Sequence, residues 1–427
     1  MHRLAIARLS FILSGLIAAS HWQPANAQSK LAADLQQKID QVAADELAKT
    51  EGPSASIAVV KNGEIAYLHA YGSARLDPST PAKPEMRYSI GSISKQFTVT
   101  AMLLLQEQGK LSIDDAVGKF IPGLTQGNKV TIRQLLSHTS GYQDFYTPDY
   151  LLPMMLQPTT ALKTAELWAR KPLDFEPGTK WQYSNTNYTI AGLIVEKASG
   201  VPLVQFLQEK VFAPLGMKSA INWDEGRPSD ADSAGYTRYA LGPLRPAPKP
   251  AGGWAFAAGE LGMTAEDLAK WDISIMNQNV MKPASYRAFE TETLLKNGSG
   301  AGYGLGLFIG SQAGHRSLSH SGGFSGYTAQ NSVFPDDRTA VVVLTNQDNS
   351  DAAEAIVSGV ATLLLSVDDP KAREKLAQAR GIFEGLQRGT IDRSLFTENA
   401  NFYFNGQALR DYGSSLGPLG ARTSLRR

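Results

Sequence analysis

The sequence predicts an α+β fold in which one antiparallel sheet is built from both ends of the main region of the chain. Runs rich in β-branched residues lie near residues 54–72 and again at 315–345, whereas helical periodicity dominates the stretch between them. A sheet must bury its apolar face against another layer. We therefore expect helices to flank the sheet and a helical lobe to be inserted, with a pocket between lobe and sheet.

The first strands are predicted as a hairpin. Residues 56–60 and 64–69 flank Asn62-Gly63, which is the strongest short signal for a two-residue hairpin turn. The returning strands are expected at 315–320, 327–334 and 339–345, and Pro335-Asp336-Asp337 is the predicted turn between the last two. A helix over 352–365 is expected to follow them.

Helical segments fill the middle of the chain. Phe97, Ala101, Leu104 and Leu105 recur at helical spacing, which predicts a helix over 92–108 that ends at Gly109. Thr264 and Asp267 form a helix-start pair of the capping-box type. The remaining predicted helices cover residues 131–138, 187–198 and 203–212.

Composition excludes several classes of function. The 427 residues include 41 Lys plus Arg and 40 Asp plus Glu, so the chain lacks the basic excess that binds nucleic acid. The absence of cysteine excludes disulfides, thiol catalysis and thiolate metal sites. No His-x-x-x-His spacing occurs, and neither a metal nor another cofactor is expected.

Residues 1–27 are expected to be a secretory signal peptide. Arg3 and Arg8 give the chain a positively charged start, and an apolar run over 9–19 follows them. Ala25-Asn26-Ala27 then supplies a small-x-small cleavage signal. The apolar run over 9–19 is shorter than the about 20 residues that a membrane span needs. We therefore expect an exported protein, periplasmic or secreted, without a stable membrane anchor.

Two further regions follow the signal peptide. Residues 28–366 are expected to form one large domain that contains the sheet and the lobe. The character changes at Asp368-Asp369-Pro370, after which a charged helix over 371–388 and a strand-like run over 401–405 are predicted. Residues 367–427 are therefore interpreted as a short C-terminal extension or an incomplete module.

A Ser-x-x-Lys arrangement occurs once, as Ser92-Ile93-Ser94-Lys95. Residues i and i+3 share one face of a helix, so the lysine amine is expected beside the serine hydroxyl. A serine becomes a good nucleophile when a neighbouring base takes its proton, and Lys95 serves if burial lowers its pKa. The N–H of Ser92, at the start of a helix, is also a candidate donor to an oxyanion.

Two later segments carry side chains suited to the same chemistry. Tyr183 beside an ammonium is a candidate base, and the amide of Asn185 is a candidate ligand for a substrate carbonyl. His320 precedes Gly322 and Gly323 on a predicted strand, where glycines let the backbone approach a ligand closely. Gly323 is the candidate for the second oxyanion donor.

Together these segments resemble the class C β-lactamase and D-alanyl-D-alanine carboxypeptidase family of penicillin-recognising serine hydrolases. The resemblance extends from about residue 31 to about residue 365, and it implies a serine β-lactamase/transpeptidase-like fold. It also implies an acyl-enzyme on Ser92, proton transfer shared by Lys95 and Tyr183, and substrate positioning by Asn185 and His320. Which of Lys95 and Tyr183 acts first is left open. Further segments that resemble the family are 135–141, 177–178, 214–217 and 264–268.

One departure from the family pattern bears on the substrate. Class C β-lactamases carry Lys-Thr-Gly at the third motif, where this chain has His320-Ser321-Gly322. A histidine is only partly charged at neutral pH, so it holds a substrate carboxylate less firmly than a lysine does. We therefore expect a small-molecule or peptide substrate and a D-Ala-D-Ala carboxypeptidase, D-peptidase or esterase activity. The alternatives are a class C-like β-lactamase and a non-hydrolytic penicillin-binding sensor.

Other candidates carry weaker expectations. His138 follows a predicted helix and is expected to complement the charge of its end. The only Gly-x-Ser-x-Gly, at 413–417, has no Asp or His after it, which excludes a nucleophile elbow. Some aromatic side chains are expected to line the cleft or the core, with no preference between the two: Tyr142, Phe145, Tyr146, Tyr150 and Trp181.

Overall fold

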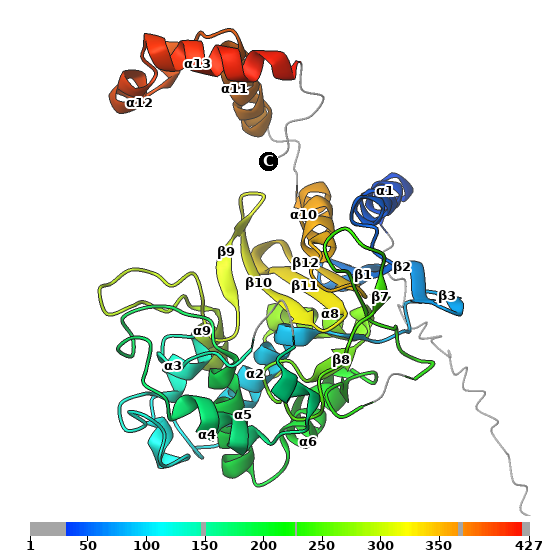
Figure 1. The fold of residues 1–427 in the computed structure, drawn as a ribbon, viewed down its shortest axis with the longest axis vertical. Coiled ribbons are helices and arrows are strands. Elements are labelled where there is room, and N and C mark those ends of the chain that lie inside the picture. The colour runs from blue at the N-terminus through cyan, green and yellow to red at the C-terminus, as the bar shows by residue number, and fades with distance from the viewer. Residues whose placement is uncertain (1–30, 147–150, 227–228, 366–369, 421–427) are drawn as a thin grey trace, which may run out of the picture.

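The computed structural model describes residues 31–146, 151–226, 229–365 and 370–420. Its centre is a seven-stranded sheet of order β3-β2-β1-β12-β11-β10-β9, in which neighbours pair antiparallel (Figure 1). The predicted sheet from both ends of the chain is confirmed. Its strands are β1 (Ser54–Lys61), β2 (Glu64–Leu76), β3 (Ser79–Pro81), β9 (Phe308–Gln312), β10 (His315–Phe324), β11 (Tyr327–Phe334) and β12 (Thr339–Thr345).

The two predicted turns of the sheet are also confirmed. Asn62 and Gly63 join β1 to β2 with φ angles of 56° and 80°, the left-handed conformations that a type I′ hairpin turn requires. A single 3-10 turn, Pro335–Asp337, joins β11 to β12. These short connections fix the register of the strands at each end of the sheet.

Helices cover both faces of this sheet. Ile57 and Val343 pack with α1 (Ala33–Thr50) and α10 (Ala352–Leu365) on one face. Their sequence neighbours Ala58 and Val342 point to the opposite face and join the larger core around α8 (Ala265–Asn277). Because both faces are covered, every residue of β12 is buried.

The helical lobe lies between the two halves of the sheet in sequence. Its buried helix α2 (Ser94–Glu107) ends at Gly109, whose φ is 70°, as the sequence predicts. The other helices are α3 (Ile132–Leu136), α4 (Ala161–Ala169), α5 (Asn185–Ser199), α6 (Leu203–Leu207), α7 (Ala213–Leu215) and α9 (Pro283–Glu290). The short strands here are β4 (Tyr88–Ser89), β5 (Ile221–Asn222), β6 (Tyr236–Thr237), β7 (Arg245–Pro246) and β8 (Leu261–Met263).

After α10 the described chain is helical. It forms α11 (Pro370–Gln387), α12 (Glu398–Tyr403) and α13 (Gly406–Leu416), of which α11 and α13 pack together (Figure 1). The strand predicted over 401–405 is wrong, because Thr397 caps α12 by accepting the N–H of Ala400. The predicted signal peptide, residues 1–27, lies outside the described residues.

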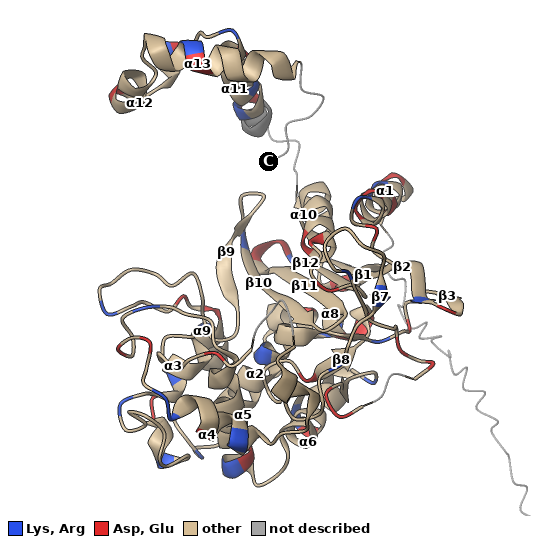
Figure 2. Ribbon diagram, viewed as in Figure 1, with Lys and Arg blue, Asp and Glu red and all other residues tan. Residues whose placement is uncertain are grey.

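Charged residues are spread over the described helices and strands (Figure 2). Figure 2 shows acidic and basic residues interspersed over the helices of both the lobe and the sheet layer. Within the described chain, no single helix is long and apolar enough to cross a membrane. Only Asn185–Ser199 and Leu203–Leu215 together have the required length and composition, and a bend of 69° separates them.

Candidate active site

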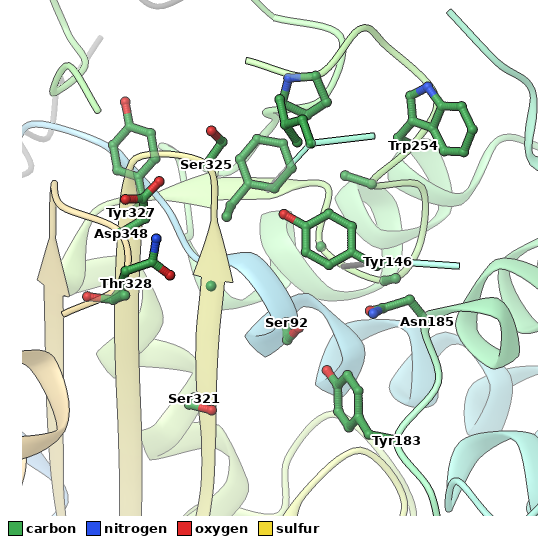
Figure 3. A pocket seen from close by; sticks show the side chains of 18 of the residues that line it. Ser92, Tyr146, Tyr183, Asn185, Trp254, Ser321, Ser325, Tyr327, Thr328 and Asp348 are labelled. Atoms are coloured by element: carbon green, nitrogen blue, oxygen red, sulfur yellow. The ribbon is translucent and has the colours of Figure 1, made fainter. Parts of the chain in front are cut away.

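Ser92 lies just before the N-terminal end of α2, in the segment that connects β4 to this helix. It is the middle residue of the 3-10 helix η1 (Gly91–Ile93), which leads directly into α2. Its side chain faces a pocket of about 1000 Å³ between the lobe and β10. Figure 3 shows Ser92 between the strand that carries Ser321 and the side chains of Tyr183 and Asn185.

Lys95 lies one helical turn after Ser92 and is completely buried. Its Nζ is 3.0 Å from Ser92 Oγ, 2.9 Å from Asn185 Oδ1 and 2.7 Å from the carbonyl oxygen of Ala258. Burial lowers the pKa of Lys95 to about 7, although the nearby charge of Asp144 acts in the opposite direction. An amine with this pKa is neutral in a large fraction of the molecules at neutral pH.

These three contacts fix the direction of the amine. The carbonyl oxygens of Asn185 and Ala258 only accept hydrogen bonds, so each of them takes one N–H of Lys95. The remaining position points at Ser92 Oγ. In the charged amine it holds an N–H, and in the neutral amine it holds the lone pair that can accept the hydroxyl proton.

Tyr183 completes the group around the hydroxyl. Burial raises the pKa of Tyr183 well above its usual value, a hydrogen bond with Ser92 opposes the rise, and the charge of Asp144 adds to it. The Lys95 ammonium lies 4.9 Å from the centre of the tyrosine ring. Burial therefore favours the neutral phenol form of Tyr183 and the neutral amine form of Lys95.

Asp144 lines the pocket, and the sequence analysis did not single it out. Its carboxylate accepts the backbone N–H of Asn185 at 2.9 Å and the side-chain Nδ2 of Asn185 at 3.1 Å. Because the carboxylate holds the NH₂ end, the Oδ1 end of Asn185 faces Lys95. No local pattern marks Asp144, since its partner lies 41 residues away in sequence.

His138 contacts the segment that carries Tyr183. Its Nδ1 accepts the N–H of Ser184 at 3.1 Å, its carbonyl accepts the N–H of Gln182, and its ring lies 4.3 Å from the ring of Tyr183. Burial lowers the pKa of His138 well below its usual value. These contacts agree with a structural role for His138, whereas burial disfavours the positive charge that complementing a helix end would need.

His320 lines the pocket with both ring nitrogens engaged in the protein. Nδ1 faces the carbonyl oxygen of Ser321 at 2.5 Å, and Nε2 lies 2.9 Å from Tyr303 Oη. A carbonyl only accepts, so Nδ1 carries the proton and Nε2 accepts from the tyrosine. Burial and the Lys95 charge lower the pKa of His320 to about 3. The sequence-based expectation of a partly charged histidine is wrong.

Glycines bring β10 against the start of α2. A Cβ on Gly91 would lie 2.7 Å from the backbone nitrogen of Gly323, and one on Gly322 would lie 2.0 Å from the carbonyl oxygen of Ile90. β9 pairs with β10 only as far as Ser319, which leaves the next residues of β10 open towards η1. Gly323 lines the pocket beside Ser92, whereas Gly322 lies against Ile90.

Aromatic and aliphatic side chains form the wall opposite β10. Phe145 and Tyr146 line the pocket beside Trp254, and Figure 3 shows Tyr146 and Trp254 above Asn185. Trp181 also lines the pocket, whereas Tyr142 is buried and donates its hydroxyl to the carbonyl of Thr125. The aromatic residues therefore divide between cleft and core, and Tyr150 lies outside the described residues.

Comparisons with known proteins show the family of the chain. The beta-lactamase family model matches residues 39–363. A penicillin-binding protein of Bacillus subtilis (strain 168) is 26% identical over 387 residues, which are 82% of this chain and 82% of that protein. A D-aminopeptidase of Cereibacter sphaeroides is 32% identical over 327 residues, which are 75% of this chain and 61% of the relative.

A solved structure gives the same result for the fold. The octameric penicillin-binding protein homologue from Pyrococcus abyssi superposes with a TM-score of 0.68 and 29% sequence identity. The match covers 82% of this chain and 81% of that chain. With the family model matching most of the sheet and the lobe, the chain belongs to the beta-lactamase family and is a serine hydrolase of that family.

Proposed function

We propose that this serine hydrolase cleaves amide or ester bonds in small neutral or cationic substrates, of the kind that D-amino-acid peptides and amides represent. The observation that carries the proposal is the charge of the pocket. None of the described residues that line it is Lys or Arg, and its histidine is neutral. Its acidic lining residues are Asp144, Asp348, Asp351 and Glu354.

This charge distribution disfavours substrates that end in a carboxylate. A D-Ala-D-Ala carboxypeptidase or a β-lactamase binds an anionic substrate, which a fixed cation stabilises. Here the anion would enter a cavity with acidic groups on its wall and an aromatic surface opposite. An amine or a neutral ester avoids that repulsion, and the name of the D-aminopeptidase relative describes a substrate with a free amine.

The proposed reaction proceeds through a covalent acyl-enzyme. The neutral Lys95 accepts the proton of Ser92 as its Oγ attacks the carbonyl carbon, and the N–H groups of Ser92 and Gly323 stabilise the oxyanion. Tyr183 then gives its phenol proton to the leaving amine or alcohol and is reprotonated by the Lys95 ammonium, which returns Lys95 to its neutral form. In the second half, the neutral Lys95 takes a proton from the water that attacks the acyl carbonyl, and this proton returns to Ser92 Oγ as the acid product departs.

A substrate panel tests this function. Wild-type protein is incubated with D-phenylalanine p-nitroanilide, p-nitrophenyl butyrate, a chromogenic cephalosporin and a peptide ending in D-Ala-D-Ala. We expect turnover of the first two with a kcat/KM at least about 100-fold above that of the anionic pair. Ser92→Ala should abolish turnover and covalent labelling. Faster cephalosporin cleavage would establish a β-lactamase, and a stable penicillin adduct without turnover would establish a sensor.

We also propose that the protein is exported. The support is the charged start, the short apolar run and the small-x-small signal at Ala25-Asn26-Ala27. Expression of the full chain in a bacterial host, followed by fractionation and N-terminal sequencing, should give a periplasmic product that starts at Gln28. A cytoplasmic product with an intact N-terminus would contradict export and leave the proposed reaction untouched.

A further inference from the structure

The segment 253–259 connects the pocket wall to the catalytic lysine. Trp254, Ala255, Ala258 and Gly259 line the pocket. The Ala258 carbonyl accepts the Lys95 amine at 2.7 Å, and the preceding carbonyl, that of Ala257, accepts Thr98 Oγ1 at 2.7 Å. A displacement of this segment therefore changes the hydrogen bonding of Lys95 directly.

Two buried carboxyl groups hold this segment, together with turn hydrogen bonds from the N–H groups of Ala258 and Gly259 to the Ala255 carbonyl. Asp224 Oδ2 accepts the N–H of Gly253 at 2.7 Å and that of Ala255 at 3.3 Å. Glu260 Oε1 accepts the N–H of Ala257 at 2.9 Å. Three alternate N–H groups along the segment are thus bound by side-chain carboxyls, and the last of them belongs to Ala257, the residue before the one whose carbonyl reaches Lys95.

Ala257 needs such support because its backbone is in an unfavourable conformation. Its φ is 58°, a left-handed value that L-residues rarely adopt. Its methyl group packs on α5, where a Cβ on Gly192 would lie 2.4 Å from it. Strained backbone of this kind persists where the surroundings hold it in place, and it clusters at functional sites.

The buried carboxyl of Glu260 is unfavourable for the stability of the fold. It is 2% exposed, its second oxygen contacts Asn222 Nδ2 at 3.2 Å, and no ion pair with it is present among the described residues. Burial raises its pKa to about 8. An unpaired buried carboxyl destabilises a fold, so its presence beside a strained turn suggests a role beyond packing.

We propose that Glu260 is a positioning residue that holds the Ala258 carbonyl against the Lys95 amine through its hydrogen bond to Ala257. The inference rests on the proposed role of Lys95 as the base for Ser92. With the carbonyl in place, two of the three positions on Nζ are occupied and the third is directed at the nucleophile. Without it, the amine loses an acceptor and is free to turn away from Ser92.

The test compares Glu260→Ala, which removes the acceptor, with Glu260→Gln, which retains a carbonyl oxygen for Ala257. We expect Glu260→Ala to lower kcat by about 10- to 100-fold with little change in KM. The low-pH limb of kcat/KM should move to lower pH, because an ammonium that loses an acceptor has a lower pKa. Glu260→Gln should stay within about 3-fold of wild type.

The exposed neighbour Glu225 provides the matched control, and Glu225→Ala should leave both kcat and the pH profile unchanged. If Glu260→Ala does not fold, Glu260→Asp withdraws the carboxyl from Ala257 and should show the same fall in kcat and the same shift. Folded fractions are measured by near-UV circular dichroism. An unchanged pH limb in a folded variant, or a Gln variant as impaired as the Ala variant, would overturn the proposal.

This test is separable from that of the proposed function. If the wild-type protein turns over neither amides nor esters, the proposed function fails before any variant of Glu260 is compared. If the wild type is active, Ser92→Ala is inactive and the Glu260 variants match wild type, only the positioning role fails.

Discussion

At the scale of single residues, the proposed reaction depends on two opposing effects on the pKa of Lys95, its burial and its fixed hydrogen-bond acceptors. Removal from water favours the neutral amine, whereas the Ala258 and Asn185 carbonyls and the charge of Asp144 favour the ammonium. The outcome is a pKa of about 7. A lysine exposed to water at this helix position would be a charged ammonium at neutral pH and could not act as a base.

The pH dependence of the reaction follows from this balance. Lys95 must be neutral to accept the Ser92 proton, so kcat/KM should rise through pH of about 7 and level off above it. Stopped-flow or steady-state rates with p-nitrophenyl butyrate between pH 5 and pH 9 measure the limb. Lys95→Arg should be inactive at every pH, because a guanidinium stays charged. A flat profile would contradict Lys95 as the base.

Asp144 affects the pH dependence of kcat/KM as well, because it holds Asn185, which contacts Lys95. Asp144→Asn should lower kcat by about 10-fold, since it places an NH₂ group against Asn185 Nδ2 and favours a flipped amide. Because Asp144 raises the pKa of Lys95, its neutralisation should also move the limb to lower pH. The combined measurement of kcat and pH profile distinguishes this effect from a general loss of stability, which leaves the limb in place.

Glu260 should appear in the pH dependence of stability. Its pKa is 4.5 in the unfolded reference and about 8 in the folded protein, so the folded state binds the proton more tightly between these values. The free energy of unfolding contributed by this group is therefore greatest below pH 4.5 and falls as pH rises towards 8. Urea unfolding of wild type and Glu260→Gln at pH 5 and pH 8 measures it. The variant should show the smaller decrease.

At the scale of elements, the close approach of β10 to η1 assembles the site. Gly322→Ala would place a methyl group against the carbonyl of Ile90, whereas nothing lies within 4 Å of a Cβ on Gly323. We expect Gly322→Ala to lower the free energy of unfolding by about 1–3 kcal/mol, and Gly323→Ala to change it by less than about 0.5 kcal/mol. Urea unfolding checks both. Equal losses would contradict the packing argument.

Helices and strands with strong local sequence signals were predictable, whereas those with weak signals were not. The hairpin at Asn62-Gly63 and the helix of Ala352–Leu365 follow from turn chemistry and periodicity. The helix Ala33–Thr50 and the exposed edge strand Phe308–Gln312 were missed, the strand because it has little apolar alternation to mark it. The aromatic run near 401–405 suggested a strand, but the cap at Thr397 directs it into a helix.

At the scale of the whole molecule, the family match and the helix α10 end at nearly the same residue. The family match ends at residue 363 and α10 ends at Leu365, whereas α11 and α13 pack on each other. Removal of residues 366–427 should therefore leave kcat/KM within about 2-fold and the unfolding transition cooperative. Steady-state kinetics and thermal unfolding of the shortened chain check this. A large loss of either would assign the extension a role in the fold or the site.

The separation of contacting residues along the chain decides which site residues could be predicted from the sequence. Ser92 and Lys95 are three positions apart on one helix, so their proximity is a local property. Asp144 reaches Asn185 from another part of the chain, and Ala258 reaches Lys95 across 163 residues. Contacts of this kind depend on the complete tertiary arrangement, and no spacing rule encodes them.

The pairing of β1 with β12 has a consequence for how the protein is made. As the ribosome releases the chain, Ser92 and Lys95 emerge early, but the strand that supplies Gly323 and the central partner Thr339–Thr345 emerge only near the end of the domain. Such distant pairings form slowly. We therefore expect a nascent or clipped polypeptide to carry Ser92 and Lys95 without a working pocket, and to gain hydrolytic activity only when β12 closes the sheet.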